Sequence, residues 1–207
     1  GPIASMPWFA KILNTRQRDI PADKMVVAIG NYAYDWGARG QPAEERTFEE
    51  AVLIAKESES KLRLDSQSLN PSFAYADDHD RVHHVWLLDA VTAFNQLVAI
   101  RPLRPRGVAL WRLGSEDPAL WKIFGKEGPL DAARAAELAE IRYAYGVDYE
   151  GKGEVLDITA QPQVGSRSVE FDAKSGLIVA EHFTAFPSPY VISRHGGAER
   201  KVVLTFD

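Results

Sequence analysis

The chain has 207 residues, of which 45% are hydrophobic and 26% charged, with a formal net charge of −5. This composition is typical of a globular protein with one domain, or with a domain and an appendage, and the lack of a basic block argues against a nucleic-acid partner. The chain has no cysteine, which excludes disulfides and cysteine-ligated metals, and no apolar run is long enough to span a bilayer.

The first part of the chain alternates amphipathic and continuous apolar segments. Pro7–Arg18 has its apolar residues at helical spacing, and Lys24–Ile29 has the continuous apolar run of a buried strand. Thr47 and Glu50 have the spacing of a capping box, which predicts a helix from there to about Ser58. The spacing of helix, short loop and buried strand is typical of an α/β fold.

The middle of the chain predicts a hairpin followed by a second buried strand. Residues 71–75 and 81–88 flank an acidic turn and are expected to pair. Asp89 is expected to cap a helix, and the apolar run Val108–Trp111 is expected to form a strand. Asp117 can cap a further helix, with Pro118 at its first position.

The last third of the chain predicts a change from helix to strands. Leu130–Tyr143 is rich in alanine and is expected to be helical, and Gly146–Gly153 is expected to be a linker. From Glu154 onwards the pattern is that of strands, with a hairpin turn at Asp172–Gly176. These features predict a domain boundary near residue 145, so that 1–145 and 146–207 form separate parts.

Aromatic side chains gather where the two buried strands are predicted to end. They are Tyr32, Tyr34 and Trp36, together with the carboxylate of Asp35, after the first strand, and Trp111 at the end of the second. Parallel α/β folds place their sites at the carboxyl ends of strands, and aromatic rings pack against the apolar faces of sugars. The alternative is that these rings only fill a core or close the end of the sheet.

The amino-acid sequence of these segments resembles that of the family 18 glycoside hydrolases, the chitinase-like (β/α)8 barrels. KMVVAIGNYAYDW, residues 24–36, resembles their seventh strand with its aromatic exit, and GVALWRLGSEDPALW, residues 107–121, resembles their eighth. Trp111 matches the tryptophan that floors the sugar subsite. The resemblance therefore implies an α/β fold built of the last strands and helices of such a barrel. An α+β insertion at about 41–90 and a β-rich connector after residue 145 complete that expected fold.

The segment GVALWRLGSEDPALW, together with VWLLDAVTAFNQ earlier in the chain, resembles one bacterial subgroup of this family in particular. In that subgroup a family 18 domain is fused to a polysaccharide deacetylase and a family 2 glycosyltransferase. Lys201–Asp207, KVVLTFD, resembles the opening of the deacetylase motif, cut short at its first aspartate. The resemblance implies an extracytoplasmic location, within a membrane-anchored envelope protein.

The catalytic residues of the family are missing from this sequence. Family 18 enzymes use an Asp-x-x-Asp-x-Asp-x-Glu run on the fourth strand and a substrate-assisted route, and no such run occurs here. We therefore expect no catalytic residue, no metal and no cofactor, and a chain inactive by itself. A hydrolase that uses Asp35 or Glu116 instead is the least favoured interpretation.

The expected function is the carbohydrate-binding portion of a domain that acts on an N-acetylglucosamine-type polysaccharide. The expected partners are that polysaccharide or an oligosaccharide of it and the remaining domains of a larger protein. The alternative is a non-catalytic assembly module of a multidomain polysaccharide-processing protein. Val26–Ile29 and Val108–Trp111 are too apolar to stand in water, so a homo-oligomer that covers these strands is a further expectation.

Overall fold

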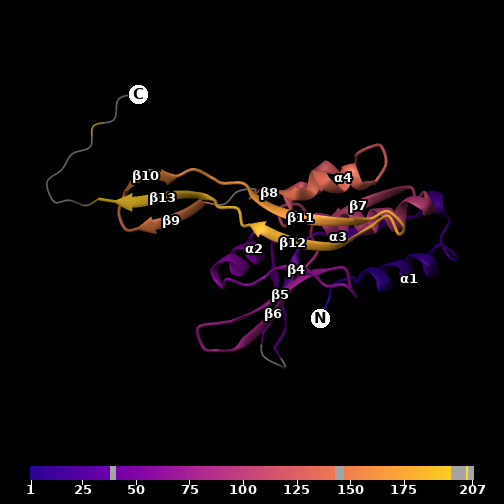
Figure 1. The fold of residues 1–207 in the computed structure, drawn as a ribbon, viewed down its shortest axis with the longest axis horizontal. Helices are drawn as coiled ribbons and strands as arrows, with labels where there is room; N and C mark the ends of the chain where they lie inside the picture. Colours follow the sequence, from indigo (N-terminus) through magenta and orange to yellow (C-terminus); the bar gives the residue numbers. More distant parts are fainter. Residues whose placement is uncertain (38–40, 143–146, 197–203, 205–207) are drawn as a thin grey trace.

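The computed structural model describes the chain except for residues 38–40, 143–146, 197–203 and 205–207. Its fold is mixed α/β, with three sheets among the described residues: a parallel pair, an eight-stranded sheet and a separate three-stranded sheet. Figure 1 shows the three-stranded sheet projecting from the rest of the described chain. No helix among the described residues is both long enough and apolar enough to cross a membrane.

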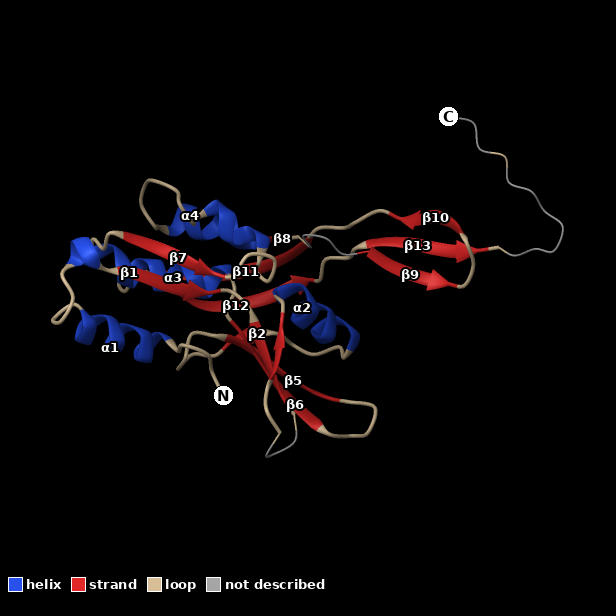
Figure 2. Ribbon diagram, turned by 180° about the vertical axis from the view of Figure 1, so that it is seen from behind, coloured by secondary structure: helices blue, strands red, loops and turns tan. Residues whose placement is uncertain are grey.

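The parallel pair consists of β1 (Val26–Gly30) and β7 (Gly107–Trp111), both of which the apolar runs predicted. Their register places Gly30 opposite Trp111, so the two carboxyl ends coincide. The two strands lie side by side in Figure 2, although about 80 residues separate them in the sequence.

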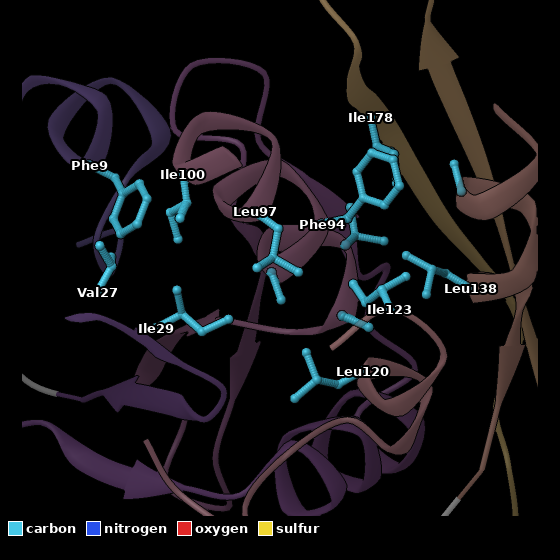
Figure 3. Packing of buried hydrophobic residues seen from close by; sticks show 14 of the residues in the cluster. Phe9, Val27, Ile29, Phe94, Leu97, Ile100, Leu120, Ile123, Leu138 and Ile178 are labelled. Atoms are coloured by element: carbon cyan, nitrogen blue, oxygen red, sulfur yellow. The ribbon is translucent and has the colours of Figure 1, made fainter. Parts of the chain in front are cut away.

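Helices α1 (Met6–Arg16) and α3 (Ala90–Ile100) pack against one face of this pair. Side chains on that face, such as Val27 and Ile29, are buried. Figure 3 shows the resulting core, in which Phe9 of α1 and Ile100 and Leu97 of α3 lie toward Val27 and Ile29, and Phe94 of α3 lies beside Ile178. Asp89 caps α3 as predicted, because its carboxylate accepts a hydrogen bond from the amide of Thr92.

The opposite face of the parallel pair is open. Val26 is 57% exposed and Trp111 is 64% exposed, and Ala28 and Ala109 between them are exposed as well. Within the described residues each of the two strands pairs only with the other, so each leaves one edge unpaired. Unpaired apolar edges favour association with further strands, and the expected homo-oligomer stays a prediction.

The eight-stranded sheet has the order β3-β2-β6-β5-β4-β12-β11-β8. It contains the predicted hairpin and joins segments from both halves of the chain. The helix α2 (Phe48–Glu57) packs against it and begins with the predicted capping box of Thr47 and Glu50. The strands are β2 (Ala33–Trp36), β3 (Glu44–Arg46), β4 (Arg63–Leu64), β5 (Pro71–Ala76), β6 (Val82–Leu87), β8 (Glu140–Ile141), β11 (Gly165–Asp172) and β12 (Leu177–Ala185).

Two local predictions for the second half of the chain are wrong. The predicted helix Leu130–Tyr143 shrinks to α4 (Ala132–Ala136) and a 3-10 turn, because the next residues pair with β11 as β8. The predicted linker contains β9 (Val147–Gly151), which pairs with a distant strand. The helix that Asp117 was expected to cap is a 3-10 helix, Pro118–Lys122.

The predicted domain boundary near residue 145 falls on residues outside the described part of the chain. On the C-terminal side of it, β11 pairs with β8, and β12 pairs with β4. Ile178 of β12 also belongs to the core around α3. The segment Lys201–Asp207, apart from Leu204, likewise lies outside the described residues.

A buried ion cluster joins the β11–β12 hairpin to the start of α3 and to the end of the loop that follows β7. The guanidinium of Arg167 on β11 lies 2.9 Å from Asp89, 2.6 Å from Asp117 and 3.0 Å from Glu181, and all four side chains are fully buried. It also donates to the carbonyl of Leu138. Burial of a charge is costly unless it is paired, so this cluster ties four segments of the chain into one packed unit.

The remaining sheet consists of β9, β10 (Val155–Ala160) and β13 (Tyr190–His195), with β13 in the centre. Every residue of β9 and β10 is exposed. Leu156, Ile158 and Tyr149 are each more than half exposed. A small sheet gains stability mainly from a covered apolar face, and none of the described residues covers this one.

Replacement of Arg167 by Met is expected to lower the free energy of unfolding by about 3–5 kcal/mol, because it leaves buried carboxylates without their cation. Urea denaturation would measure the loss. Arg167→Lys, which keeps the charge but not the fork of donors, is expected to lose less. Arg18→Met at an exposed position is the matched control and should stay within about 0.5 kcal/mol. A loss below about 1 kcal/mol in R167M would contradict the role given to the cluster.

The free energy of unfolding is expected to depend on pH, because one carboxyl group of this cluster, that of Glu181, is expected to stay protonated in the folded chain. Burial, and then the charge of Asp89, raise the pKa of Glu181. A raised carboxyl pKa means that the folded chain keeps a proton that the unfolded chain releases. The contribution of this group to the free energy of unfolding is therefore fully present below its pKa in the unfolded chain, ~4.3. It falls by at most about 1.4 kcal/mol per pH unit as pH rises toward the pKa of Glu181 in the folded chain.

The variant Glu181→Gln carries no such proton, so its stability relative to the wild type should increase with pH above ~4.3. Urea midpoints at a series of pH values would show this. Glu57→Gln, at an exposed position, should follow the wild type throughout. Parallel curves for E181Q and the wild type would show that the buried carboxyl is ionised.

The rate of amide hydrogen exchange is expected to differ between the three-stranded and the eight-stranded sheet. The amides of β9, β10 and β13 should exchange far faster than those of β11 and β12, because few buried side chains hold that small sheet closed. Mass spectrometry of exchanged peptides would test this. Equal protection of the two groups would mean that another surface covers the three-stranded sheet in solution.

Candidate functional site

The carboxyl ends of β1 and β7 are held together by Asn31. Its amide donates to the carbonyl of Trp111 over 3.0 Å, and its side-chain oxygen accepts from the amide of Asp117 over 2.6 Å. Ser115 donates its hydroxyl to the carbonyl of Asn31 over 2.9 Å. These bonds fix the loop that follows Trp111, whose peptide bond to Arg112 is cis. The side-chain nitrogen of Asn31 is buried and has no hydrogen-bond partner among the described residues.

Trp111 and Tyr32 line a common cavity of about 240 Å³ at this end of the strands. Trp8 of α1 and Gln96 of α3 also line it. Trp8 is 52% exposed, so the cavity has two largely accessible indole rings on its walls. Apolar ring faces with an amide beside them can pack against a sugar ring and accept or donate a hydrogen bond at its hydroxyls.

A row of aromatic rings continues from this cavity along β2. The rings of Tyr32 and Tyr34 meet edge to face with centroids 5.5 Å apart, and those of Tyr34 and Trp36 are 6.2 Å apart. The three residues share one face because side chains alternate along a strand. Burial raises the pKa of Tyr32, so its hydroxyl stays protonated and remains a donor.

Asp35 points away from this row. Its carboxylate accepts a hydrogen bond from the hydroxyl of Tyr75 over 2.7 Å and lies 2.9 Å from Nδ1 of His83. It lines a different cavity, of about 420 Å³, together with Arg81 and other residues. The structure thus brings four of the five candidate residues into one aromatic row and cavity, and it separates the carboxylate of Asp35 from them.

The other carboxylates near Trp111 are held by partners. Asp117 is buried against Arg167 and accepts from the amides of Ala119 and Ala90. Glu116 accepts from the indole nitrogen of Trp121 over 3.3 Å and from the amide of Gly114. Among the described residues, no group of three His, Cys, Asp or Glu side chains is arranged to hold a metal ion.

Two residues at this end of the strands, one that fixes the loop and one that lines the cavity, were not identified from the sequence. Asn31 was taken only as the end of a strand. A polar side chain directly after a predicted parallel strand is the sequence signal that could have identified it. Trp8 was assigned to the packed stripe of α1, whereas its side chain lies on the cavity wall. The sequence carries no local signal that separates an exposed indole from a packed one.

The comparisons with curated proteins find relatives among bacterial lytic enzymes. The chain is 31% identical over 113 residues to the "Cortical fragment-lytic enzyme" of Bacillus subtilis, which covers 53% of this chain and 26% of that protein. It is 27% identical over 127 residues to an uncharacterized glycosylase, YvbX, of the same organism, covering 61% of this chain and 37% of the relative. The chain thus spans about a quarter to two fifths of these relatives. A scan against protein-family models finds no match.

The comparisons with solved structures give the fold. The spore cortex-lytic enzyme SleL of Bacillus megaterium matches with a TM-score of 0.54 and 26% identity, covering 58% of this chain and 29% of that one. A chitinase from Chromobacterium violaceum matches with a TM-score of 0.54 and 25% identity, covering 58% and 38%. These matches support a family 18 glycoside hydrolase-like domain. The resemblance to this family was first indicated by the sequences of the two strands, and these matches support it. The fold is of the chitinase-like α/β type.

The variant Asp35→Asn is expected to lose stability, because an amide cannot accept from both Tyr75 and His83. The loss should be about 1–3 kcal/mol in urea denaturation. Asp78→Asn, on the exposed acidic turn, is the matched control and should change little. If D35N keeps its stability but loses affinity for sugars, the carboxylate acts on a ligand instead.

Proposed function

We propose that this chain is the carbohydrate-binding portion of a family 18 glycoside hydrolase-like domain that acts on an N-acetylglucosamine-type polysaccharide. The observation that carries the proposal is the row of rings Tyr32, Tyr34 and Trp36, whose first member lines a common cavity with Trp111 at the carboxyl ends of paired parallel strands. The names of the relatives, which include cortex-lytic enzymes and a chitinase, support a glycan ligand.

In the proposed binding mode the exposed indole of Trp111 packs against the apolar face of one sugar. Tyr32 beside it donates a hydrogen bond from its protonated hydroxyl, and the rings of Tyr34 and Trp36 take the next sugar along the row. Aromatic rings suit this task because their faces are apolar and carry partial negative charge, which favours the C–H groups of a sugar. None of these residues transfers a proton, so the chain binds and orients the glycan.

The catalytic acid is proposed to come from outside this chain. Asp117 and Glu116 have partners, as described above, and the acidic run of the family is missing from the sequence. In this proposal β1 and β7 are the last two strands of a (β/α)8 barrel, with residues 41–90 as an insertion. Their unpaired edges then receive the other strands of that barrel.

The wider organisation is proposed on the same resemblance. The chain would belong to a membrane-anchored, extracytoplasmic envelope protein, in which a β-rich connector over residues 146–207 leads to a deacetylase domain. Relatives that act on spore cortex support a location outside the cytoplasm.

The alternative is a non-catalytic assembly module. The observation that favours it is the apolar surface of β9 and β10, which the described residues leave uncovered. In that case the aromatic row would pack against a neighbouring domain, and no sugar would bind there.

Replacement of Trp111 by Ala is expected to weaken binding of N-acetylglucosamine tetramers about tenfold, which corresponds to about 1.4 kcal/mol of stacking. Titration followed by tryptophan fluorescence, with calorimetry as a check, would measure this. Because Trp111 is 64% exposed, stability should change by less than about 0.5 kcal/mol. Trp121→Phe, outside the aromatic row, is the control. No measurable binding by the wild-type chain would favour the assembly module.

A further inference from the structure

A second open cavity, of about 490 Å³, lies away from the aromatic row. It is formed where α2 ends, β4 begins and β12 extends beyond its pairing with β4. Its walls combine basic, apolar and hydroxyl side chains with one carboxylate, from these three elements and the loops next to them. The lining residues are Lys56, Glu59, Ser60, Lys61, Leu62, Arg63, His182, Phe183 and Phe186.

Three cations, Lys56, Lys61 and Arg63, line this cavity against one carboxylate, that of Glu59, so its lining keeps an excess of positive charge. Among the described residues, no ion pair joins Lys56, Lys61 or Arg63 to a carboxylate. Arg63 lies directly opposite His182 in the β4–β12 pair, so a cation and an imidazole are adjacent there. Cations gathered without partners in a chain of net charge −5 create a local attraction for an anion.

The apolar part of the cavity consists of two phenyl rings. Phe183 and Phe186 have centroids 5.8 Å apart and planes inclined by 34°, and both are partly exposed. A bare phosphate or carboxylate would make no use of these rings. A ligand that matches both parts carries an acidic group and an apolar ring face.

We propose that this cavity binds an acidic oligosaccharide, in which a carboxylate-bearing sugar pairs with Lys61 and Arg63. Its ring face would pack against Phe183 and Phe186, and Glu59 and Ser60 would accept hydrogen bonds from hydroxyl or amide groups. An open cavity of about 490 Å³ accommodates one or two sugar units at a time. This site shares no residue with the Trp111 row, so the inference stands independently of the proposed function.

Calorimetric titration of the full chain tests this inference with two tetrasaccharides of similar size. One is an uncharged N-acetylglucosamine tetramer, and the other alternates N-acetylglucosamine with glucuronate. The uronate tetramer should lose affinity as salt is raised, because exposed ion pairs are screened. Lys61→Gln and Arg63→Gln should each weaken it about three- to tenfold, and Phe186→Ala about as much.

Lys11→Gln, which removes an exposed lysine on α1, is the matched control and should leave the affinity unchanged. Circular dichroism would show that each variant is folded. The inference is overturned if K61Q and R63Q bind the uronate tetramer as the wild type does, or if inorganic phosphate displaces it at equal concentration. Trp111→Ala separates the two sites, because it should affect the uncharged tetramer and leave uronate binding at the second cavity in place.

Discussion

The whole structure depends on one buried cation. Arg167 lies out of contact with water among three carboxylates, and each of these comes from a different part of the chain: Asp89 before α3, Asp117 after β7 and Glu181 on β12. A charge in such a place is stable only when its partners are held at the right distance. The hairpin of β11 and β12 is therefore a structural component of the α/β body.

The same cluster reaches the candidate site through a short chain of contacts. Asp117 binds Arg167 with its carboxylate and donates its own amide to the side chain of Asn31. Asn31 in turn donates its amide to the carbonyl of Trp111. The backbone at Trp111 is thus linked through Asn31 and Asp117 to the buried charge of Arg167, so a change at Arg167 is expected to affect both packing and the site.

Elements marked by local signals could be predicted from the sequence. The capping box of Thr47 and Glu50 and the cap at Asp89 both fix a helix start with residues three apart, and the structure has them as expected. The apolar runs of β1 and β7 likewise identify strands, but the burial expected of them is wrong on one face, which is open in this structure. Their parallel pairing followed from the family resemblance, since a run of apolar residues does not say which strand lies next to it.

What could not be predicted depends on distant partners. Nothing around Arg167 in the sequence indicates that it meets carboxylates 50 and 78 residues earlier. β9 was taken for a linker because glycines border it and its partner β13 lies about 40 residues away. The four aromatic candidate residues do lie together in the structure, and their role in binding stays a prediction. Asp35 was grouped with the rings because it stands between them in the sequence, whereas a strand sends neighbouring side chains to opposite faces.

The position of Arg167 also determines the order in which the chain can fold during synthesis. Asp89 and Asp117 leave the ribosome long before the arginine that neutralises them, and until then a closed core would contain unpaired acids. The nascent chain must therefore keep this region hydrated, or protonated, through the synthesis of a further 50 residues. Completion of β11 is the event that allows water to leave, so the α/β body matures only after its C-terminal hairpin has been made.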